Sequence, residues 1–405
     1  FISLLWLTEG FQLWLTALLV PVLLILFTNT KPQQAFSPFF DPIIALLFGG
    51  FILAVALQKH KLDLRIAYFF IKLFGNKPKQ FALGLMAATA FLSMWISNTA
   101  STLMMIPIAI AALKATKLKP LKSNYGKAVV LGIGYAATIG GTITLIGTPP
   151  NLIAVRFLEE IGRNVSFAKW ILYALPPAIV MIFVSWLILH LMYKPEIKEV
   201  KAPHIQSKKL NKKQKYVLLV FFATALLWLT NFIHGIHSSV IALLPVFAFF
   251  PTGYLKKTDL GKVGWNILIL VGGSLSLGLA IHSSGLSVEI ADFLSMLISG
   301  QSTFVTYFII ALAGVIFTAV ATNTGSAAIL IPIIVPLAPI LGVDPVILAI
   351  LLSIVISYDL VVPVGTPPNT IAYGTGYVRV MDMVKPGLII SFLSVVLFSL
   401  FALVW

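Results

Sequence analysis

Two short polar motifs each occur twice in this chain, and all four copies interrupt apolar stretches. Ser97-Asn98-Thr99 is matched by Thr322-Asn323-Thr324, and the pentapeptide GTPPN stands at both 147–151 and 365–369. Hydroxyl, carboxamide and carbonyl oxygens suit a hard cation such as Na⁺. Hydroxyl and amide hydrogens, together with the free N–H groups of a helix start, suit an anion. The four motifs therefore indicate a site that could hold both kinds of ion.

The GTPPN motif should end one helix and start another. Proline has no N–H, clashes with the preceding helical turn and disfavours helical geometry in the residue before it. It is well tolerated in the first turn of a helix. We therefore expect helix breaks at 147–151 and 365–369, each of which frees carbonyl oxygens on one side and N–H groups on the other.

Hydroxyl residues recur at matched distances before the asparagine of each tip. They are Ser93 and Ser97 before Asn98, and Thr318 and Thr322 before Asn323. Positions i and i+4 share one helix face, so the two oxygens of a pair can meet one ion. The motif segments contain no Arg, Lys or His. An anionic substrate would therefore be held by neutral donors, and a co-bound cation would supply the compensating charge.

The composition predicts an all-α polytopic membrane protein. Of the 405 residues, 59% are hydrophobic and 10% are charged, whereas a soluble domain is roughly half apolar and about a quarter charged. Many apolar runs approach the ~20 residues that span a bilayer. The ~10-residue alternating strands of an outer-membrane barrel are not seen in the sequence. The chain has no Cys, so thiol chemistry is excluded.

The net charge of +15 comes from lysines in short loops between apolar runs. This is the pattern of the positive-inside rule, and it indicates topology rather than nucleic-acid binding. The largest lysine cluster lies in the linker 194–215. We expect this linker in the cytoplasm and the protein in the cell (inner or plasma) membrane.

The chain contains an internal repeat. Gly49-Gly50, Asn98 and Gly147 recur as Gly272-Gly273, Asn323 and Gly365, at shifts of 223, 225 and 218 residues. Internal repeats are typical of secondary transporters, whose substrate site lies near the bilayer midplane between discontinuous helices. The distribution of loop lysines favours a second repeat that is inverted relative to the first.

Each tip lies between two apolar arms. Around the first tip, 97–99, the arms are Phe81–Ile96 and Leu103–Leu113, with lysines at both outer ends. This pattern predicts a re-entrant hairpin that enters and leaves the membrane on one side. Thr303–Ile340, with its tip at 322–324, repeats the pattern from the opposite face. Irregular backbone at that depth must be buried in protein or line a cavity.

Other interpretations of the motifs are weaker. Small polar residues also allow close packing of membrane helices, but duplication in register favours a binding site. The apolar runs contain no HExxH motif, paired aspartates or nucleophile–base pair, which excludes an intramembrane enzyme of those kinds. Re-entrant tips from both faces suit alternating access better than a continuous channel.

With these motifs the chain resembles the divalent anion–sodium symporter family, the INDY-type di- and tricarboxylate transporters. That family is marked by Ser-Asn-Thr at hairpin tips and Thr-Pro-Pro in each half, which stand here at 97–99, 148–150 and 366–368, with Thr-Asn-Thr at 322–324. The resemblance covers nearly the whole chain. It implies a homodimer with eleven transmembrane helices and two re-entrant hairpins per protomer, the first helix preceding Phe1. It also implies a transport domain that slides as an elevator against a scaffold.

The resemblance also implies which segments and residues do what. It divides the chain into scaffold (1–76) and transport (77–193) parts of repeat 1, the linker 194–215, and scaffold (216–300) and transport (301–405) parts of repeat 2. The residues implied to bind substrate carboxylates are Asn98, Thr99, Thr148, Pro149, Asn323, Thr324, Thr366 and Pro367. One Na⁺ site is implied at Ser93, Ser97, Asn98 and Gly147, and a second at Thr318, Ala321, Asn323 and Gly365. No organic cofactor or nucleic-acid partner is expected.

The implied function is secondary transport of C4/C5 dicarboxylates, such as succinate, malate, fumarate and 2-oxoglutarate, by Na⁺ symport. The family also contains exchangers that need no Na⁺ gradient, and the wider group moves citrate, sulfate or arsenite. Thr322 replaces the family's Ser, and Asp359 is a lone carboxylate in an apolar run whose repeat partner is Gly141. Symport and exchange therefore both remain open, and Asp359 fits either ion coupling or a buried structural hydrogen bond.

Overall fold

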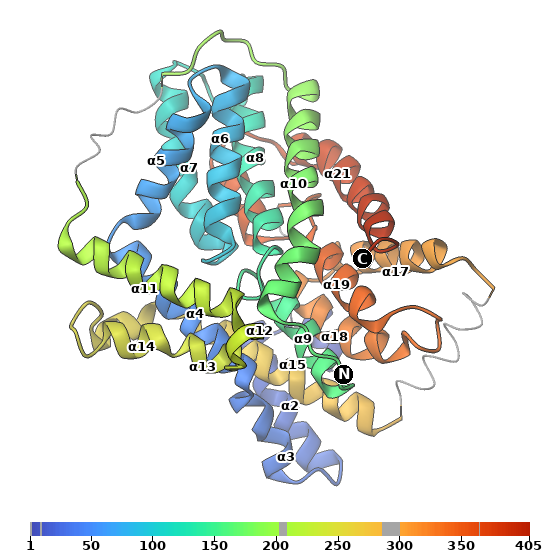
Figure 1. The fold of residues 1–405 in the computed structure, drawn as a ribbon. Coiled ribbons are helices and arrows are strands. Elements are labelled where there is room, and N and C mark those ends of the chain that lie inside the picture. The colour runs from blue at the N-terminus through green and yellow to red at the C-terminus, as the bar shows by residue number, and fades with distance from the viewer. Residues whose placement is uncertain (1, 9, 202–208, 286–299, 364) are drawn as a thin grey trace.

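The computed structural model describes residues 2–8, 10–201, 209–285, 300–363 and 365–405. Every regular element in these ranges is a helix, which confirms the predicted all-α fold class (Figure 1). Residues 202–208 of the predicted linker and 286–299 of the second predicted scaffold part lie outside the described residues.

The first half of the chain, up to the linker, contains ten α-helices and one short 3₁₀-helix within the described residues. They are α1 (Ile2–Thr8), α2 (Leu13–Phe27), α3 (Pro32–Phe36), η1 (Ser37–Phe40), α4 (Pro42–Lys59), α5 (Leu62–Phe74), α6 (Pro78–Ser93), α7 (Asn98–Ala115), α8 (Asn124–Gly141), α9 (Pro149–Glu160) and α10 (Phe167–Met192).

The second half of the chain, after the linker, is also built of helices within its described residues. Its described elements are α11 (Lys212–Leu229), α12 (Asn231–His234), α13 (Ser238–Ala242), α14 (Leu244–Phe249), η2 (Lys257–Lys262), α15 (Trp265–Ser283), α17 (Thr303–Thr318), α18 (Asn323–Ile334), η3 (Val335–Leu337), α19 (Pro345–Ser357), α20 (Pro367–Gly374) and α21 (Val380–Phe401).

Four helical stretches in the described residues are long and apolar enough to cross a membrane. They are Pro32–Lys59, Asn98–Ala115, Phe167–Met192 and Val380–Phe401, and shorter apolar helices accompany them. Large apolar side chains also stand on the outside, and on α11 those of Leu219, Phe222 and Leu226 are each more than half exposed. Lipid or a partner chain must cover such a surface. The count of eleven transmembrane helices stays a prediction.

Both predicted arms of each tip are helical. Helices α6 and α7 flank the first tip, and α17 and α18 flank the second. The second helix of each pair starts at the tip asparagine itself, because the preceding hydroxyl residue caps it. Ser97 Oγ accepts from the Ala100 N–H at 3.3 Å, and Thr322 Oγ1 accepts from the Gly325 N–H at 3.3 Å. A capping hydroxyl of this kind satisfies one of the free N–H groups of a helix start.

The two helix breaks are longer than expected and begin earlier. The chain leaves α8 after Gly141 and resumes helix at Pro149, and it leaves α19 after Ser357 and resumes at Pro367. The prediction that 147–151 and 365–369 are themselves the breaks is therefore only half right. Each Pro-Pro-Asn already forms the first helical turn, where a missing proline N–H removes no hydrogen bond.

The two halves of the chain interlock around these breaks. The helix after each tip packs against the helix that follows the break of the other half: α7 against α20, and α18 against α9. In Figure 1, α5 to α8 form a group at the top of the view, while α9, α15 and α18 lie below them toward the centre. The tips and breaks are thereby placed inside the protein rather than on its periphery.

Ion pairs link residues near the ends of several helices. Lys127 on α8 pairs with Asp382 on α21 at 2.8 Å, and Lys59 at the end of α4 pairs with Asp259 of η2 at 2.5 Å. Asp259 also accepts from Lys262 at 3.1 Å. Burial alone would raise the pKa of Asp259, but the hydrogen bonds from Lys59, the Lys256 amide and Lys262 outweigh it and hold that pKa below its usual range.

Replacing Asp259 with Asn is expected to lower the unfolding temperature by several degrees at pH 7, because Lys59 loses its buried partner. A carboxyl whose pKa falls on folding stabilises the protein above its ordinary pKa of about 4 and loses that effect as the pH falls through the lowered value. The difference between the wild type and Asp259→Asn should therefore begin to narrow below about pH 4. Thermal unfolding of the detergent-solubilised protein between pH 7 and pH 3 measures this. Lys262→Met, which removes only the exposed partner, should change little; an equal loss there would contradict the assignment.

Candidate functional site

The asparagine of each tip is held by the hydroxyl group five residues before it. Ser93 Oγ donates to Asn98 Oδ1 at 2.6 Å, and Thr318 Oγ1 donates to Asn323 Oδ1 at 2.9 Å. Ser93 and Thr318 are fully buried, whereas the two asparagines are half-buried. Each pair ties the last turn of one helix to the first turn of the next. The two halves therefore build the same local structure from different hydroxyl residues.

The first tip lies directly on the first break. A Cβ on Gly141 would stand 2.1 Å from Asn98 Oδ1, and a Cβ on Gly147 would stand 2.3 Å from the Gly141 carbonyl oxygen. Only glycine permits both approaches. Gly141 is thus sandwiched between Asn98 and Gly147, two of the residues implied to bind the first Na⁺.

The last residue of each GTPPN motif organises the loop that precedes it. Asn151 Nδ2 lies 3.2, 3.3 and 2.8 Å from the carbonyl oxygens of Gly141, Thr142 and Thr144. Asn369 Nδ2 likewise donates to the carbonyl oxygens of Asp359 and Val362, at 3.1 and 3.0 Å. These residue pairs match across the halves, because 141 corresponds to 359, 144 to 362 and 151 to 369. The carboxamides close each break into a defined loop.

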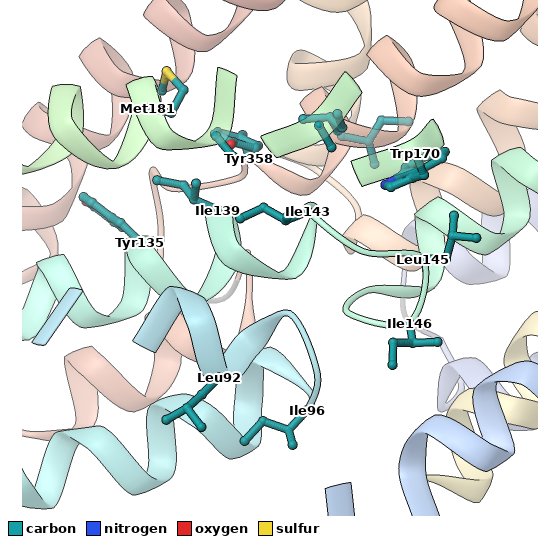
Figure 2. Packing of buried hydrophobic residues seen from close by; sticks show 14 of the residues in the cluster. Leu92, Ile96, Tyr135, Ile139, Ile143, Leu145, Ile146, Trp170, Met181 and Tyr358 are labelled. Carbon is teal, nitrogen blue, oxygen red and sulfur yellow. The ribbon is translucent and has the colours of Figure 1, made fainter. Parts of the chain in front are cut away.

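The first loop is buried in the protein core. Ile143, Leu145 and Ile146 belong to the packed cluster in Figure 2, and Trp170 of the same cluster donates its indole N–H to the Thr142 carbonyl at 3.0 Å. Apolar side chains on one side and satisfied carbonyl oxygens on the other let irregular backbone lie at membrane depth.

The second tip contacts the second break differently. Asn323 Nδ2 donates to the Ser357 carbonyl oxygen at 2.9 Å. Beyond Ser357 the chain carries Asp359, whose carboxylate lies against Gly365, so that a Cβ on Gly365 would stand 1.9 Å from Oδ2. In the first half the corresponding neighbours are two glycines. The second break therefore contains a buried carboxylate where the first break has a glycine.

The remaining predicted residues lie at the helix starts that follow the tips and the breaks, or next to them. Thr99 and Thr324 are half-buried in the first turns of α7 and α18. Thr148 and Thr366 are the buried residues before α9 and α20, and Thr366 Oγ1 accepts from the Asn369 N–H at 3.3 Å. In the adjoining positions Pro149 is half-buried and Pro367 is exposed, whereas Ala321 is buried and Ser97 caps α7.

Contacts link Asn98 through Gly141 to Gly147 in the first half, and they join Thr318 to Asn323 and Asp359 to Gly365 in the second. Hydrogen bonds also cross between the halves. Ser353 Oγ on α19 donates to Asn151 Oδ1 at 2.9 Å. Two cavities, of ≈ 310 and ≈ 490 Å³, are lined by none of the predicted site residues. Leu145 of the first break loop, Glu159 and His237 line the first, and Asn76 and Lys117 line the second. The motif region is marked by its broken helices and polar contacts.

Sequence reasoning missed the part played by Asn151 and Asn369. Both are fully buried and both stand inside a motif that had already been recognised by its prolines. Their repetition at the same place was the available signal. It also missed Gly141, which nothing in the sequence marks except its alignment with Asp359.

Asn151→Ala is expected to lower the free energy of unfolding by about 2–4 kcal/mol, because it leaves buried carbonyl oxygens without a donor and Ser353 without its acceptor. Asn369→Ala, which removes fewer bonds, should cost less. Chemical unfolding of the purified protein measures both. Asn124, exposed in the first turn of α8, supplies the control, and a loss in Asn124→Ala as large as that in Asn151→Ala would be evidence against this account.

Two solved structures of transporters share this fold. The YdaH transporter of Alcanivorax borkumensis matches with a TM-score of 0.61 and 14% identity, over 92% of this chain and 86% of its own. MtrF of Neisseria gonorrhoeae, described as one of a class of antimetabolite efflux pumps, matches with a TM-score of 0.60 and 14% identity, over 95% of this chain and 84% of its own. At this identity the likeness shows the fold alone.

Sequence relatives are closer and cover nearly the whole chain. A protein named "Uncharacterized transporter" from Haemophilus influenzae is 35% identical, over 98% of this chain and 88% of its own length. Proteins named sodium-dependent dicarboxylate transporter SdcS, from Staphylococcus saprophyticus and Staphylococcus aureus, are 34% and 33% identical, over 98% of this chain and 82% of theirs.

The family match spans residues 1–405 and is described as "Sodium:sulfate symporter transmembrane region". It agrees with the resemblance drawn from the duplicated Asn and Thr-Pro-Pro motifs. The family and these relatives are membrane transporters and not enzymes. The chain therefore belongs to the sodium:sulfate symporter family and is an integral membrane transporter of the dicarboxylate or anion class.

Proposed function

We propose that this protein carries C4/C5 dicarboxylates, such as succinate, malate, fumarate and 2-oxoglutarate, across the membrane together with Na⁺. The observation that carries the proposal is the matched pair of tips, Ser93–Asn98 and Thr318–Asn323, each lying beside a broken helix. The sodium-dependent dicarboxylate transporters among the relatives support both the substrate class and the ion.

The two carboxylates of the substrate would be bound by equivalent groups of the two halves. One would lie at Asn98 and Thr99 with the α9 start at Thr148 and Pro149. The other would lie at Asn323 and Thr324 with the α20 start at Thr366 and Pro367. Helix N-termini carry partial positive charge and free N–H groups, so they favour anions without a cationic side chain.

Sodium would occupy the oxygen-rich side of each tip. The first ion would be held by Ser93, Ser97, Asn98 and Gly147, and the second by Thr318, Ala321, Asn323 and Gly365. Within each set the Asn Oδ1 and the buried hydroxyl oxygen lie close enough to share one ion. Positive charge there would offset the dianion, whose burial without compensation costs several kcal/mol per charge.

The pattern of loop charges and the family membership support a wider architecture for this protein. The two halves would be inverted repeats, with re-entrant hairpins around the tips at 97–99 and 322–324. The lysine-rich linker 194–215 would be cytoplasmic. The transport parts, 77–193 and 301–405, would slide as an elevator against a scaffold that also holds a homodimer, and the apolar outer face of α11 is available for lipid or for such a partner.

Uptake of labelled succinate into proteoliposomes tests the proposal. Uptake should require external Na⁺, and malate, fumarate and 2-oxoglutarate should compete while acetate and lactate should not. Fast counterflow between internal and external dicarboxylate with no Na⁺ on either side would instead make the protein an exchanger. Transport of citrate, sulfate or arsenite without succinate would overturn the substrate class.

A further inference from the structure

Asp359 is a buried carboxylate with no side-chain partner. The residue is 1% exposed, and neither Oδ1 nor Oδ2 accepts or donates a hydrogen bond within the described part of the chain. The backbone N–H of Val361 lies near the carboxylate but outside hydrogen-bond geometry. Water no longer solvates a buried polar group, so such a group is normally hydrogen-bonded. A buried charge normally has an ion-pair partner or a metal ion beside it.

In the part of the chain that the structure describes, no charged side chain of the neighbouring helices pairs with the Asp359 carboxylate. Lys127 on α8 is engaged with Asp382 of α21, and Lys385 of α21 is exposed. Helices α18 and α20 carry no charged residue, and α19 has only its N-terminal cap, Asp344. Within the described residues none of these groups forms an ion pair with Asp359. A protonated carboxyl would be no better placed, because it needs an acceptor and the described residues form no hydrogen bond with either oxygen.

The repeat shows what this position faces. In the first half the equivalent residue, Gly141, is wedged between Asn98 and Gly147, the tip and break residues of the first proposed Na⁺ site. In the second half Asp359 lies against Gly365. The tip Asn323 reaches the same stretch of chain through the Ser357 carbonyl. Residue 359 therefore lies against the break residue of the second proposed Na⁺ site, two residues after the carbonyl that the tip contacts.

We propose that Asp359 is a carboxylate ligand of the Na⁺ ion at the second site, in addition to Thr318, Ala321, Asn323 and Gly365. This inference rests on the proposed function, because it assumes that the second tip and break bind a cation. It assigns the unpaired oxygens of Asp359 a partner of the right kind, since a hard cation prefers carboxylate, hydroxyl and carbonyl oxygens.

The carboxylate makes the two cation sites unequal. The first site has only neutral oxygen ligands, whereas the second has a full negative charge in a buried setting, where opposite charges attract strongly. The second site should therefore bind Na⁺ more tightly and retain it when no dicarboxylate is present. Thr322 stands where the family has Ser. On this proposal the second cation site is kept despite that change, and it gains the negative charge of Asp359.

Binding of ²²Na⁺ to the purified wild-type protein, without any dicarboxylate, tests the inference directly. The wild type should show a tight phase and a weaker phase. Asp359→Asn should weaken the tight phase by about tenfold or more while leaving the weaker phase in place. Asp359→Gly, which installs the residue of the first half, should do the same, and it serves if the Asn variant does not fold. Asp344→Asn, an exposed carboxylate at the other end of α19, is the matched control.

The same experiment separates this inference from the proposed function. Unchanged ²²Na⁺ binding in folded Asp359→Asn and Asp359→Gly overturns the ligand role, as does a wild type that binds no Na⁺. A lost tight phase, with no dicarboxylate uptake by the wild type, overturns the proposed substrate but leaves Asp359 as a cation ligand. Equal weakening in Asp344→Asn would show a general charge effect and would also overturn the assignment.

Discussion

Asn98→Ala and Asn323→Ala are each expected to reduce Na⁺-dependent succinate uptake by about 100-fold or more, although both variants should fold. Each asparagine has one carboxamide oxygen that accepts from a buried hydroxyl, at 2.6 Å from Ser93 and at 2.9 Å from Thr318. The same oxygen is proposed to bind Na⁺, and the amide is proposed to face the substrate. Losing both contacts removes roughly 3 kcal/mol of binding, which corresponds to a rate loss of this size.

The matched control is Asn124→Ala, because Asn124 follows a capping serine at the start of α8 just as Asn98 follows Ser97 at the start of α7. Asn124 is exposed and far from either tip in sequence. Its replacement should leave uptake within about twofold of the wild type. Uptake near the wild-type rate in a folded Asn98→Ala or Asn323→Ala protein would rule out a site built from both tips.

Much of the helix pattern could be predicted from the sequence, because it depends on local chemistry. Ser97 and Thr322 cap helices, and Pro149 and Pro367 open them, as the hydrogen-bonding needs of a helix start require. The limits of the breaks could not be read in the same way. Residues 142–146 alternate threonines with apolar residues and carry no break signal of their own, and hydrogen bonds that involve Asn151, Trp170 and Thr144 hold the loop outside a helix.

The contacts between tip and break were also beyond the sequence. That Gly141 touches Asn98 depends on how α7 packs against α8, over a separation of more than forty residues, and no local propensity encodes it. Asp359 illustrates the same limit. The sequence marked it as a carboxylate in an apolar run with a glycine partner, but its place against Gly365 and its unpaired oxygens appear only in the folded protein.

Gly141→Ala is expected to reduce Na⁺-dependent uptake at least about tenfold, with a loss of stability of no more than about 1–3 kcal/mol. The new Cβ would lie 2.1 Å from Asn98 Oδ1. That atom ends a side chain that can rotate, so the fold can relieve the clash by moving it, and overpacking of this kind typically costs about 1–3 kcal/mol. The movement would break the bond from Ser93 and remove a proposed ligand of the first Na⁺. The Na⁺ concentration that gives half-maximal uptake should therefore rise more than the KM for the dicarboxylate.

Gly147→Ala and Gly374→Ala show whether this effect is specific. The Cβ of Gly147→Ala would meet the Gly141 carbonyl oxygen at 2.3 Å, which is backbone and cannot rotate away, so this variant should lose stability as well as uptake. Gly374, at the end of α20, has open space around a new Cβ, and its replacement should do neither. Na⁺ titrations of uptake and thermal unfolding of all three variants decide the matter. A Gly141→Ala protein with wild-type Na⁺ dependence would mean that the orientation of Asn98 does not govern the first cation site.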